Sequence, residues 1–145
     1  MKKMMLTLAI TISTLGAFAR EANVSEKVLK AFTTEFTTAK DVEWTIGSNY
    51  YMASFLYNEK YVYAYYSEDG ELLGLRRNMS PVDLPLNLQT SLKKEYAGYW
   101  ISDLIEVAKA EGTAYYITLE NADTKLVLKA SGGNGWGHYQ KVKKA

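Results

Sequence analysis

The sequence predicts an α+β fold made of two tandem repeats, each with one helix followed by four antiparallel strands, and with the helices packed on one face of the sheet. Three observations predict it. Two short stretches carry apolar residues at the spacing of a helix, and eight short stretches carry the alternation of a strand. The order of these stretches, one helix and then four strands, occurs twice, which is typical of an internal repeat.

The first helix is predicted from an apolar stripe. Val28, Phe32 and Phe36 stand four residues apart and therefore share one helical face. Asn23 precedes Glu26 by three residues, the spacing of a capping box, so we expect the helix to begin beside Asn23.

Four strands are predicted to follow this helix. The alternation of apolar and polar residues gives strands at 41–46, 50–57, 60–66 and 71–77. Turn residues separate them at Gly47-Ser48-Asn49, at Asn58-Glu59 and at the stretch that ends with Asp69-Gly70.

The second half repeats this plan after a short linker that holds both prolines. Pro85 suits the first turn of a helix, where Leu88, Leu92 and Tyr96 form the apolar stripe, and Gly98 is placed to stop it. Strands are predicted at 101–108, 114–120, 125–130 and 136–142. The helices of the two halves match at an offset of 60 residues and the central hairpins at 64, which gives repeats at about 23–77 and 84–142.

The first twenty residues have the pattern of a secretory signal peptide. Lys2 and Lys3 precede an apolar run, which ends in the cleavage signal Ala17-Phe18-Ala19. The run is short for a membrane span, so we expect a signal peptide at 1–19, a single mature domain at 20–145, and a periplasmic or secreted protein without membrane insertion.

Composition excludes several classes of function. Loss of Lys2 and Lys3 leaves 15 basic residues against 16 acidic ones, a formal charge of −1. A nucleic-acid partner is therefore not expected, because such binding needs a basic surface. The chain has no cysteine, so disulfides cannot stabilise the mature domain.

The two central hairpins differ on one of their faces. The predicted core face is apolar in both halves: Tyr51, Ala53, Phe55, Val62, Ala64 and Tyr66 in the first, and Tyr115, Ile117, Leu119, Leu126, Leu128 and Ala130 in the second. The opposite face of the second half is largely polar, whereas that of the first half is apolar and aromatic: Tyr50, Met52, Ser54, Leu56, Tyr61, Tyr63 and Tyr65.

An aromatic sheet face with no second layer predicts a contact surface for a protein or peptide partner. We expect Tyr50, Met52, Tyr61, Tyr63 and Tyr65 to bind that partner, together with Trp136, which a flexible glycine-rich hairpin would present. The alternative is that the tyrosines form ordinary cross-strand pairs and that Trp136 packs on the sheet edge.

The sequence carries little sign of catalysis. His138 is the single histidine, expected on the surface of the last strand, and its pairing with Ser131 lacks a third group. The acidic stretch Ser67–Glu71 lacks the ligand pattern of a calcium loop and is better explained as a hairpin turn. No catalytic residue, metal site or cofactor is therefore predicted.

The chain resembles the PepSY-like, β-lactamase-inhibitor-like family of exported bacterial proteins. The resemblance lies in LKAFTTEFTTAKDVEW, YYMASF, YVYAYYSEDGELLG, DLPLNLQTSLKKEYAGYWISDLIEV, TAYYITLEN and TKLVLKA, and covers nearly the whole mature chain. It implies the tandem helix-plus-four-strand fold, a location outside the cytoplasm, and a non-catalytic, inhibitor-like role in which an open sheet face grips the target with aromatic residues. It brings no catalytic residues.

Together these observations predict an exported binding protein, in its sharpest form an inhibitor or modulator of an envelope protein. A carrier that holds a small apolar ligand between helices and sheet is the alternative, and an unrecognised hydrolase is the third. A second copy of the chain could also cover the aromatic face, so a homodimer is possible.

Overall fold

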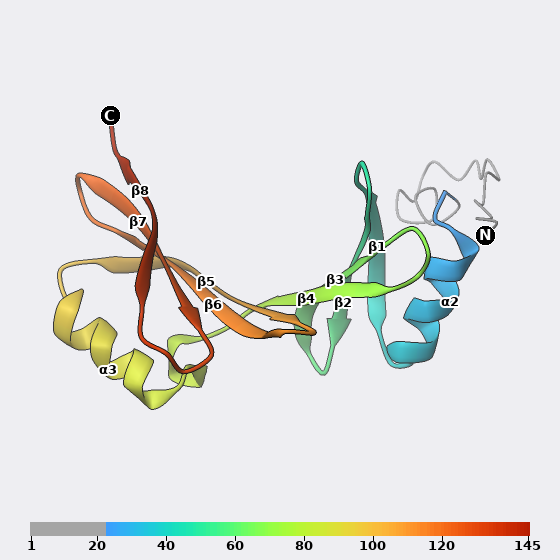
Figure 1. The fold of residues 1–145 in the computed structure, drawn as a ribbon, viewed down its shortest axis with the longest axis horizontal. Helices are drawn as coiled ribbons and strands as arrows, with labels where there is room; N and C mark the ends of the chain where they lie inside the picture. The colour runs from blue at the N-terminus through green and yellow to red at the C-terminus, as the bar shows by residue number, and fades with distance from the viewer. Residues whose placement is uncertain (1–22) are drawn as a thin grey trace. The chain divides into compact units, whose positions relative to one another are not determined.

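The computed structural model describes residues 23–145, so the predicted signal peptide lies outside the described residues. The described residues divide into two compact units, of which the first ends at Leu75 and the second spans Arg76–Ala145. Neighbouring strands in the sheet are consecutive in the sequence throughout, and the pairs are antiparallel wherever their register is defined (Figure 1). Connections of this kind need only short turns.

The first unit contains one helix and then strands. Helix α2 spans Glu26–Glu35 and is followed by β1 (Lys40–Ile46), β2 (Tyr51–Tyr57), β3 (Lys60–Tyr66) and β4 (Leu72–Asn78). The last strand continues past Leu75 into the second unit. These bounds lie within one residue of the predicted strands.

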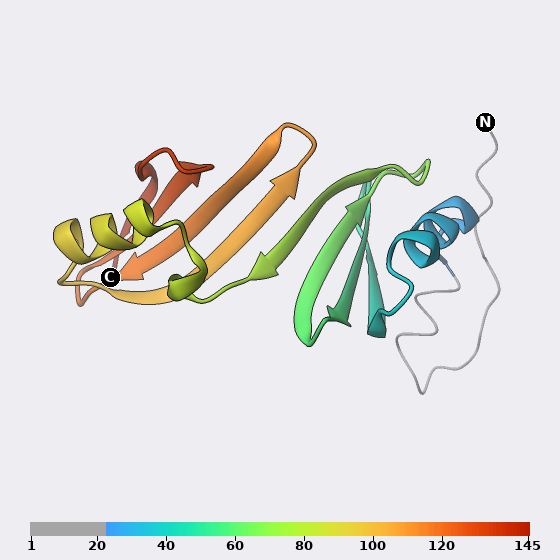
Figure 2. The same cartoon turned by 90° about the horizontal axis from the view of Figure 1, so that it is seen from below.

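The second unit repeats the order. A short 3₁₀ helix, η1 (Pro81–Asp83), precedes α3 (Leu86–Glu95), and then come β5 (Trp100–Lys109), β6 (Gly112–Glu120), β7 (Thr124–Ser131) and β8 (Gly137–Lys143). In Figures 1 and 2 each helix lies along one face of the strands of its own unit. The predicted α+β fold of two tandem helix-plus-four-strand repeats is thus confirmed.

The start of α2 differs from the prediction. Ser25, not Asn23, is the N-cap residue, and the Ser25 side chain makes no capping hydrogen bond. The Ser25 carbonyl accepts the first helical hydrogen bond, from the N–H of Leu29 at 3.0 Å. The Ser25 side chain is fully buried, so packing, rather than a polar cap, sets where this helix begins.

Aromatic rings fill the space between α2 and its strands. Phe32 meets Trp44 edge-on, with centroids 5.3 Å apart, and Phe55 in the same way at 4.9 Å. Edge-to-face contacts at this distance are favourable beyond simple burial. All six residues predicted for the core face of this hairpin are buried, as alternation along a strand requires.

The core of the second unit is aliphatic rather than aromatic. Leu88 and Leu92 of α3 pack with Leu104, Ile117, Leu119, Leu126 and Leu128 of the strands. Tyr115 is half-buried against the same cluster, and the other five predicted core residues of this hairpin are buried. The two halves therefore share one pattern of burial with different side chains.

Candidate partner-binding face

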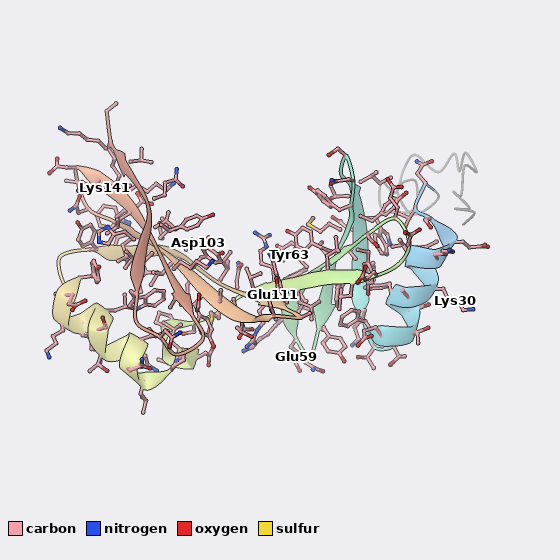
Figure 3. The ribbon with its side chains drawn as sticks, in the orientation of Figure 1. Lys30, Glu59, Tyr63, Asp103, Glu111 and Lys141 are labelled. Atoms are coloured by element: carbon pink, nitrogen blue, oxygen red, sulfur yellow. The ribbon has the colours of Figure 1, made fainter. Side chains whose placement is uncertain are left out.

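The seven residues predicted for the open face of the β2–β3 hairpin lie together, and we call them the tyrosine face: Tyr50, Met52, Ser54, Leu56, Tyr61, Tyr63 and Tyr65. Cross-strand pairing places Met52 opposite Tyr65, Ser54 opposite Tyr63 and Leu56 opposite Tyr61. Every intervening residue of these strand segments is buried under α2, so the seven side chains share the other side. Figure 3 shows Tyr63 on the side of the sheet away from α2.

The tyrosine face is open to different degrees along its length. Tyr61 is 55% exposed, whereas the other six residues are half-buried. The face is therefore a packed aromatic surface with one prominent ring at the end nearest the hairpin turn. Large, stiff rings of this kind suit contact with another protein, because little side-chain entropy is lost on binding.

A two-residue turn fixes the register of the tyrosine face. Asn58 and Glu59 connect β2 to β3, and both have positive φ, 51° and 64°. Two successive residues of this conformation are typical of a type I′ turn, whose twist matches that of the hairpin. Figure 3 shows Glu59 at the tip of the hairpin.

Tyr50 joins the face from the turn before β2. Its carbonyl accepts a hydrogen bond from the N–H of Gly47 at 2.8 Å, and its ring lies 5.7 Å from that of Tyr65. The Tyr50 ring lies over Gly47, where a side chain would collide with it. A residue without a side chain at position 47 thus lets the aromatic surface extend beyond the strand.

Strand β1 adds a polar border to the tyrosine face, which the sequence alone did not predict. Thr45 is paired with Met52 and Glu43 with Ser54, so both share the side of their partners. A bulge between Lys40 and Glu43, with Asp41 at a φ of 52°, shifts the rest of the strand. Alternation had grouped Glu43 with Thr45, but only the β1–β2 register shows which residues they adjoin.

The corresponding face of the second unit is charged. Tyr116 is paired with Lys129, Thr118 with Val127 and Glu120 with Lys125. Each of these pairs follows its counterpart in the first unit by 64 residues, so the predicted hairpin offset is confirmed by strand register. Only Tyr116 brings a ring to these six positions, and it stacks edge-on with Tyr139 of β8 at 5.2 Å.

Trp136 does not lie on an open sheet face. It packs against the core of the second unit, and its Nε1–H donates to the carbonyl of Leu88 in α3 at 3.1 Å. The glycine-rich segment before it is also tied to α3, because Asn87 Nδ2 donates to the carbonyl of Gly133 at 2.6 Å. The half-buried Trp136 indole therefore lies against the first turn of α3, and its contact with a partner stays a prediction.

The remaining candidates for chemistry are dispersed. His138 is exposed on β8, opposite Leu128, as predicted. Among residues 23–145, no three histidine, cysteine, aspartate or glutamate side chains gather closely enough to hold a metal ion. The Ser67–Glu71 stretch forms a hairpin turn, in which Gly70, at a φ of 88°, donates its N–H to the carbonyl of Ser67 at 3.0 Å. Within the described part of the chain, no helix is long and apolar enough to cross a bilayer.

The repeated order of one helix and four antiparallel strands defines a protein of the β-lactamase-inhibitor-like fold. The chain is similar to a BLIP-like protein from Bacteroides fragilis, with 19% identity and a TM-score of 0.73 over 84% of this chain and 89% of that one. A candidate periplasmic protein from Bacteroides eggerthii matches with 14% identity and a TM-score of 0.74, over 83% and 88% of the two chains. A DUF2874 family protein from Bacteroides uniformis matches with 16% identity and a TM-score of 0.71, over 81% and 88%.

These similarities concern the fold, because identities this low do not carry function. No family model and no curated protein matches the sequence. The resemblance inferred from the sequence is thus confirmed at the level of three-dimensional structure.

Proposed function

We propose that this chain is an exported, non-catalytic protein that binds a protein or peptide partner through the tyrosine face. One observation carries the proposal. At six equivalent positions of the two hairpins, the first unit has three tyrosines, a methionine, a leucine and a serine, where the second has a tyrosine, two lysines, a glutamate, a threonine and a valine. Because one repeat folds with a charged face at these positions, folding does not require an aromatic face in the other repeat.

Export supports the choice of partner. The signal-peptide pattern of residues 1–19 would leave residues 20–145 as the mature protein outside the cytoplasm. The solved proteins of similar fold include one described as BLIP-like and one as a candidate periplasmic protein. We therefore infer that the partner is an envelope protein, which this chain inhibits or modulates.

The proposal is tested by affinity capture from an envelope extract. Wild type is compared with the triple variant Tyr61→Ala/Tyr63→Ala/Tyr65→Ala, and both are first compared by thermal unfolding. The matched control is Tyr116→Ala/Tyr139→Ala, which removes two rings from the open face of the other unit. We expect wild type and control to retain the same protein and the triple variant to lose it.

Two outcomes would contradict this proposal. Retention of the same protein by the triple variant would show that the tyrosine face is not the contact surface. A large loss of stability in that variant would show that the rings are structural. A small molecule released from wild type in native mass spectrometry would instead support a carrier, although core side chains fill both helix–sheet interfaces.

A further inference from the structure

The second unit shows how a tyrosine on this kind of sheet face is covered by a cation. Lys129 lies opposite Tyr116 in the β6–β7 register, and its Nζ is 5.5 Å from the centroid of the Tyr116 ring. An ammonium group at this distance is attracted to the electron-rich face of the ring. The second unit thus supplies from its own sequence the group that a tyrosine ring prefers as a neighbour.

The first unit has tyrosines where the second has these lysines. The offset of 64 residues aligns Tyr65 with Lys129 and Tyr61 with Lys125. Tyr61 is also the most exposed residue of the tyrosine face. The positions that supply cations in one repeat therefore supply cation-binding rings in the other.

The charge of the first unit favours a cationic neighbour. Residues 23–75 contain four lysines and eight acidic residues, a formal charge of −4, whereas residues 76–145 contain ten basic and seven acidic residues, a formal charge of +3. Glu43 borders the tyrosine face through its pairing with Ser54, and Glu59 lies at the hairpin tip. None of the four lysines of this unit is a residue of the tyrosine face. Lys40 and Lys60 stand at the first positions of β1 and β3, and Lys27 and Lys30 lie on α2.

We propose that the partner meets the tyrosine face with lysine or arginine side chains, which lie over the rings of Tyr61 and Tyr65 as Lys129 lies over Tyr116. This inference rests on the proposed function and names the chemistry of the partner. The negative unit attracts a basic partner over long range, and the rings then hold its cations at short range. Arginine would bind with its planar group stacked on the ring, and lysine with its ammonium over the centre.

The test uses purified protein and three synthetic peptides of equal length. One alternates lysine with leucine, the second has methionine in place of each lysine, and the third has glutamate there. Binding is followed by the NMR signals of the tyrosine rings and by titration calorimetry. We expect the lysine peptide alone to shift the ring signals of Tyr61 and Tyr65, with an affinity that falls as salt is added.

Two matched variants separate cation–ring contact from simple charge or apolar area. Tyr61→Phe/Tyr65→Phe keeps both rings and should bind the lysine peptide within about threefold of wild type. Tyr61→Leu/Tyr65→Leu keeps apolar area without a ring, and each lost ring should weaken binding by about threefold to tenfold. Equal affinities of the leucine variant and wild type, or of the methionine and lysine peptides, would overturn the proposal.

Envelope capture distinguishes failure of this inference from failure of the proposed function. If wild type and the leucine variant retain the same protein equally, and high salt does not release it, the partner exists but is not held by cations. If wild type retains nothing, the proposed function itself fails. If wild type instead self-associates, with loss of association in the leucine variant, a second copy covers the face and a separate basic partner is ruled out.

Discussion

The ring of Tyr50 lies so close over Gly47 that a β carbon added to Gly47 would collide with the Cε2 and Cζ atoms of the ring. In this position the centroid of the Tyr50 ring lies 5.7 Å from that of the Tyr65 ring. The glycine therefore shapes the end of the tyrosine face without belonging to it.

Gly47→Ala should displace the Tyr50 ring while the fold persists. Atoms at the far end of a side chain can move aside, so we expect a loss of about 1 kcal/mol or less in the free energy of unfolding. The NMR signals of Tyr50 and Tyr65 should shift, and partner capture should weaken. Gly98→Ala is the control, because a β carbon at Gly98 meets no atom within 4 Å.

A double-mutant cycle isolates this contact. In a Tyr50→Ala background the alanine at position 47 has no ring to displace, so the two substitutions should not be additive. Additive losses would mean that alanine at position 47 acts through the turn backbone rather than through Tyr50.

The β2–β3 turn contains a residue in an unfavourable conformation. Glu59 has a φ of 64°, which costs a residue with a β carbon about 1–2 kcal/mol. Glu59→Gly creates the preferred Asn-Gly turn, and we expect the free energy of unfolding to rise by about 0.5–1 kcal/mol after the entropy lost by glycine. Chemical denaturation measures this change in the free energy of unfolding. Glu59→Ala keeps the strained conformation and should give no gain; a gain there as large as that of glycine would assign the effect to the lost charge.

Tyr66 carries a buried hydroxyl without a hydrogen-bond partner among residues 23–145. An unpaired buried polar group costs about 1–3 kcal/mol, so Tyr66→Phe should stabilise the fold by about 1 kcal/mol. Thermal or urea unfolding would measure the gain. Tyr65→Phe, on the more open side of the same strand, should change stability by less than about 0.5 kcal/mol.

Tyr66 should also make the stability of the fold sensitive to alkaline pH. Burial, and to a lesser extent the nearby Glu35 carboxylate, raise the pKa of Tyr66 to about 12. The unfolded chain releases this proton near pH 10, the ordinary value. The part of the stability that depends on a protonated Tyr66 is therefore complete below pH 10 and is lost as pH rises toward 12. Tyr66→Phe should lose less stability than wild type over that window. Equal losses would place the alkaline transition at other tyrosines.

The end of the chain is anchored by Lys144. Its Nζ lies 2.9 Å from Glu120 Oε1 and 2.8 Å from the carbonyl of Asn121, and it stands 4.9 Å from the centre of the Trp100 ring. A hydrogen bond from Ser102, and then the bond and charge of Lys144, lower the pKa of Glu120. Ser102 Oγ also lies 3.4 Å from the carbonyl of Thr118, so its single proton is shared between two acceptors and we expect Lys144 to matter most.

A carboxyl group whose pKa is lower in the folded state stabilises the fold only while the group is ionised. The stability that Glu120 contributes is present above its unfolded pKa, near the ordinary 4.5, and is lost as pH falls through the lower folded value. In an NMR titration, Lys144→Gln should move the pKa of Glu120 upward toward 4.5. Lys143→Gln, on exposed β8, is the control. An unchanged pKa in Lys144→Gln would assign the effect to Ser102 and Lys125.

Much of the fold follows from local patterns in the sequence. The strand bounds, the core face of each hairpin and the turn at Asn58-Glu59 depend on residues within about a dozen positions of one another. The two-residue period of a strand allows one assignment of faces once the apolar set is known. That is why the sequence alone predicts every residue of the tyrosine face and of its largely polar counterpart.

What the sequence determined by itself was therefore the order of the elements and which side chains share a face; the tertiary structure decided what those faces adjoin. Only the β1–β2 pairing brings Glu43 and Thr45 beside the tyrosines, because a bulge sets that register. Only the packing of α3 shows that Trp136 lies against the core of the second unit, since its partner Leu88 lies 48 residues earlier. Contacts between distant segments arise from the balance of many packing interactions, and a local period carries no information about them.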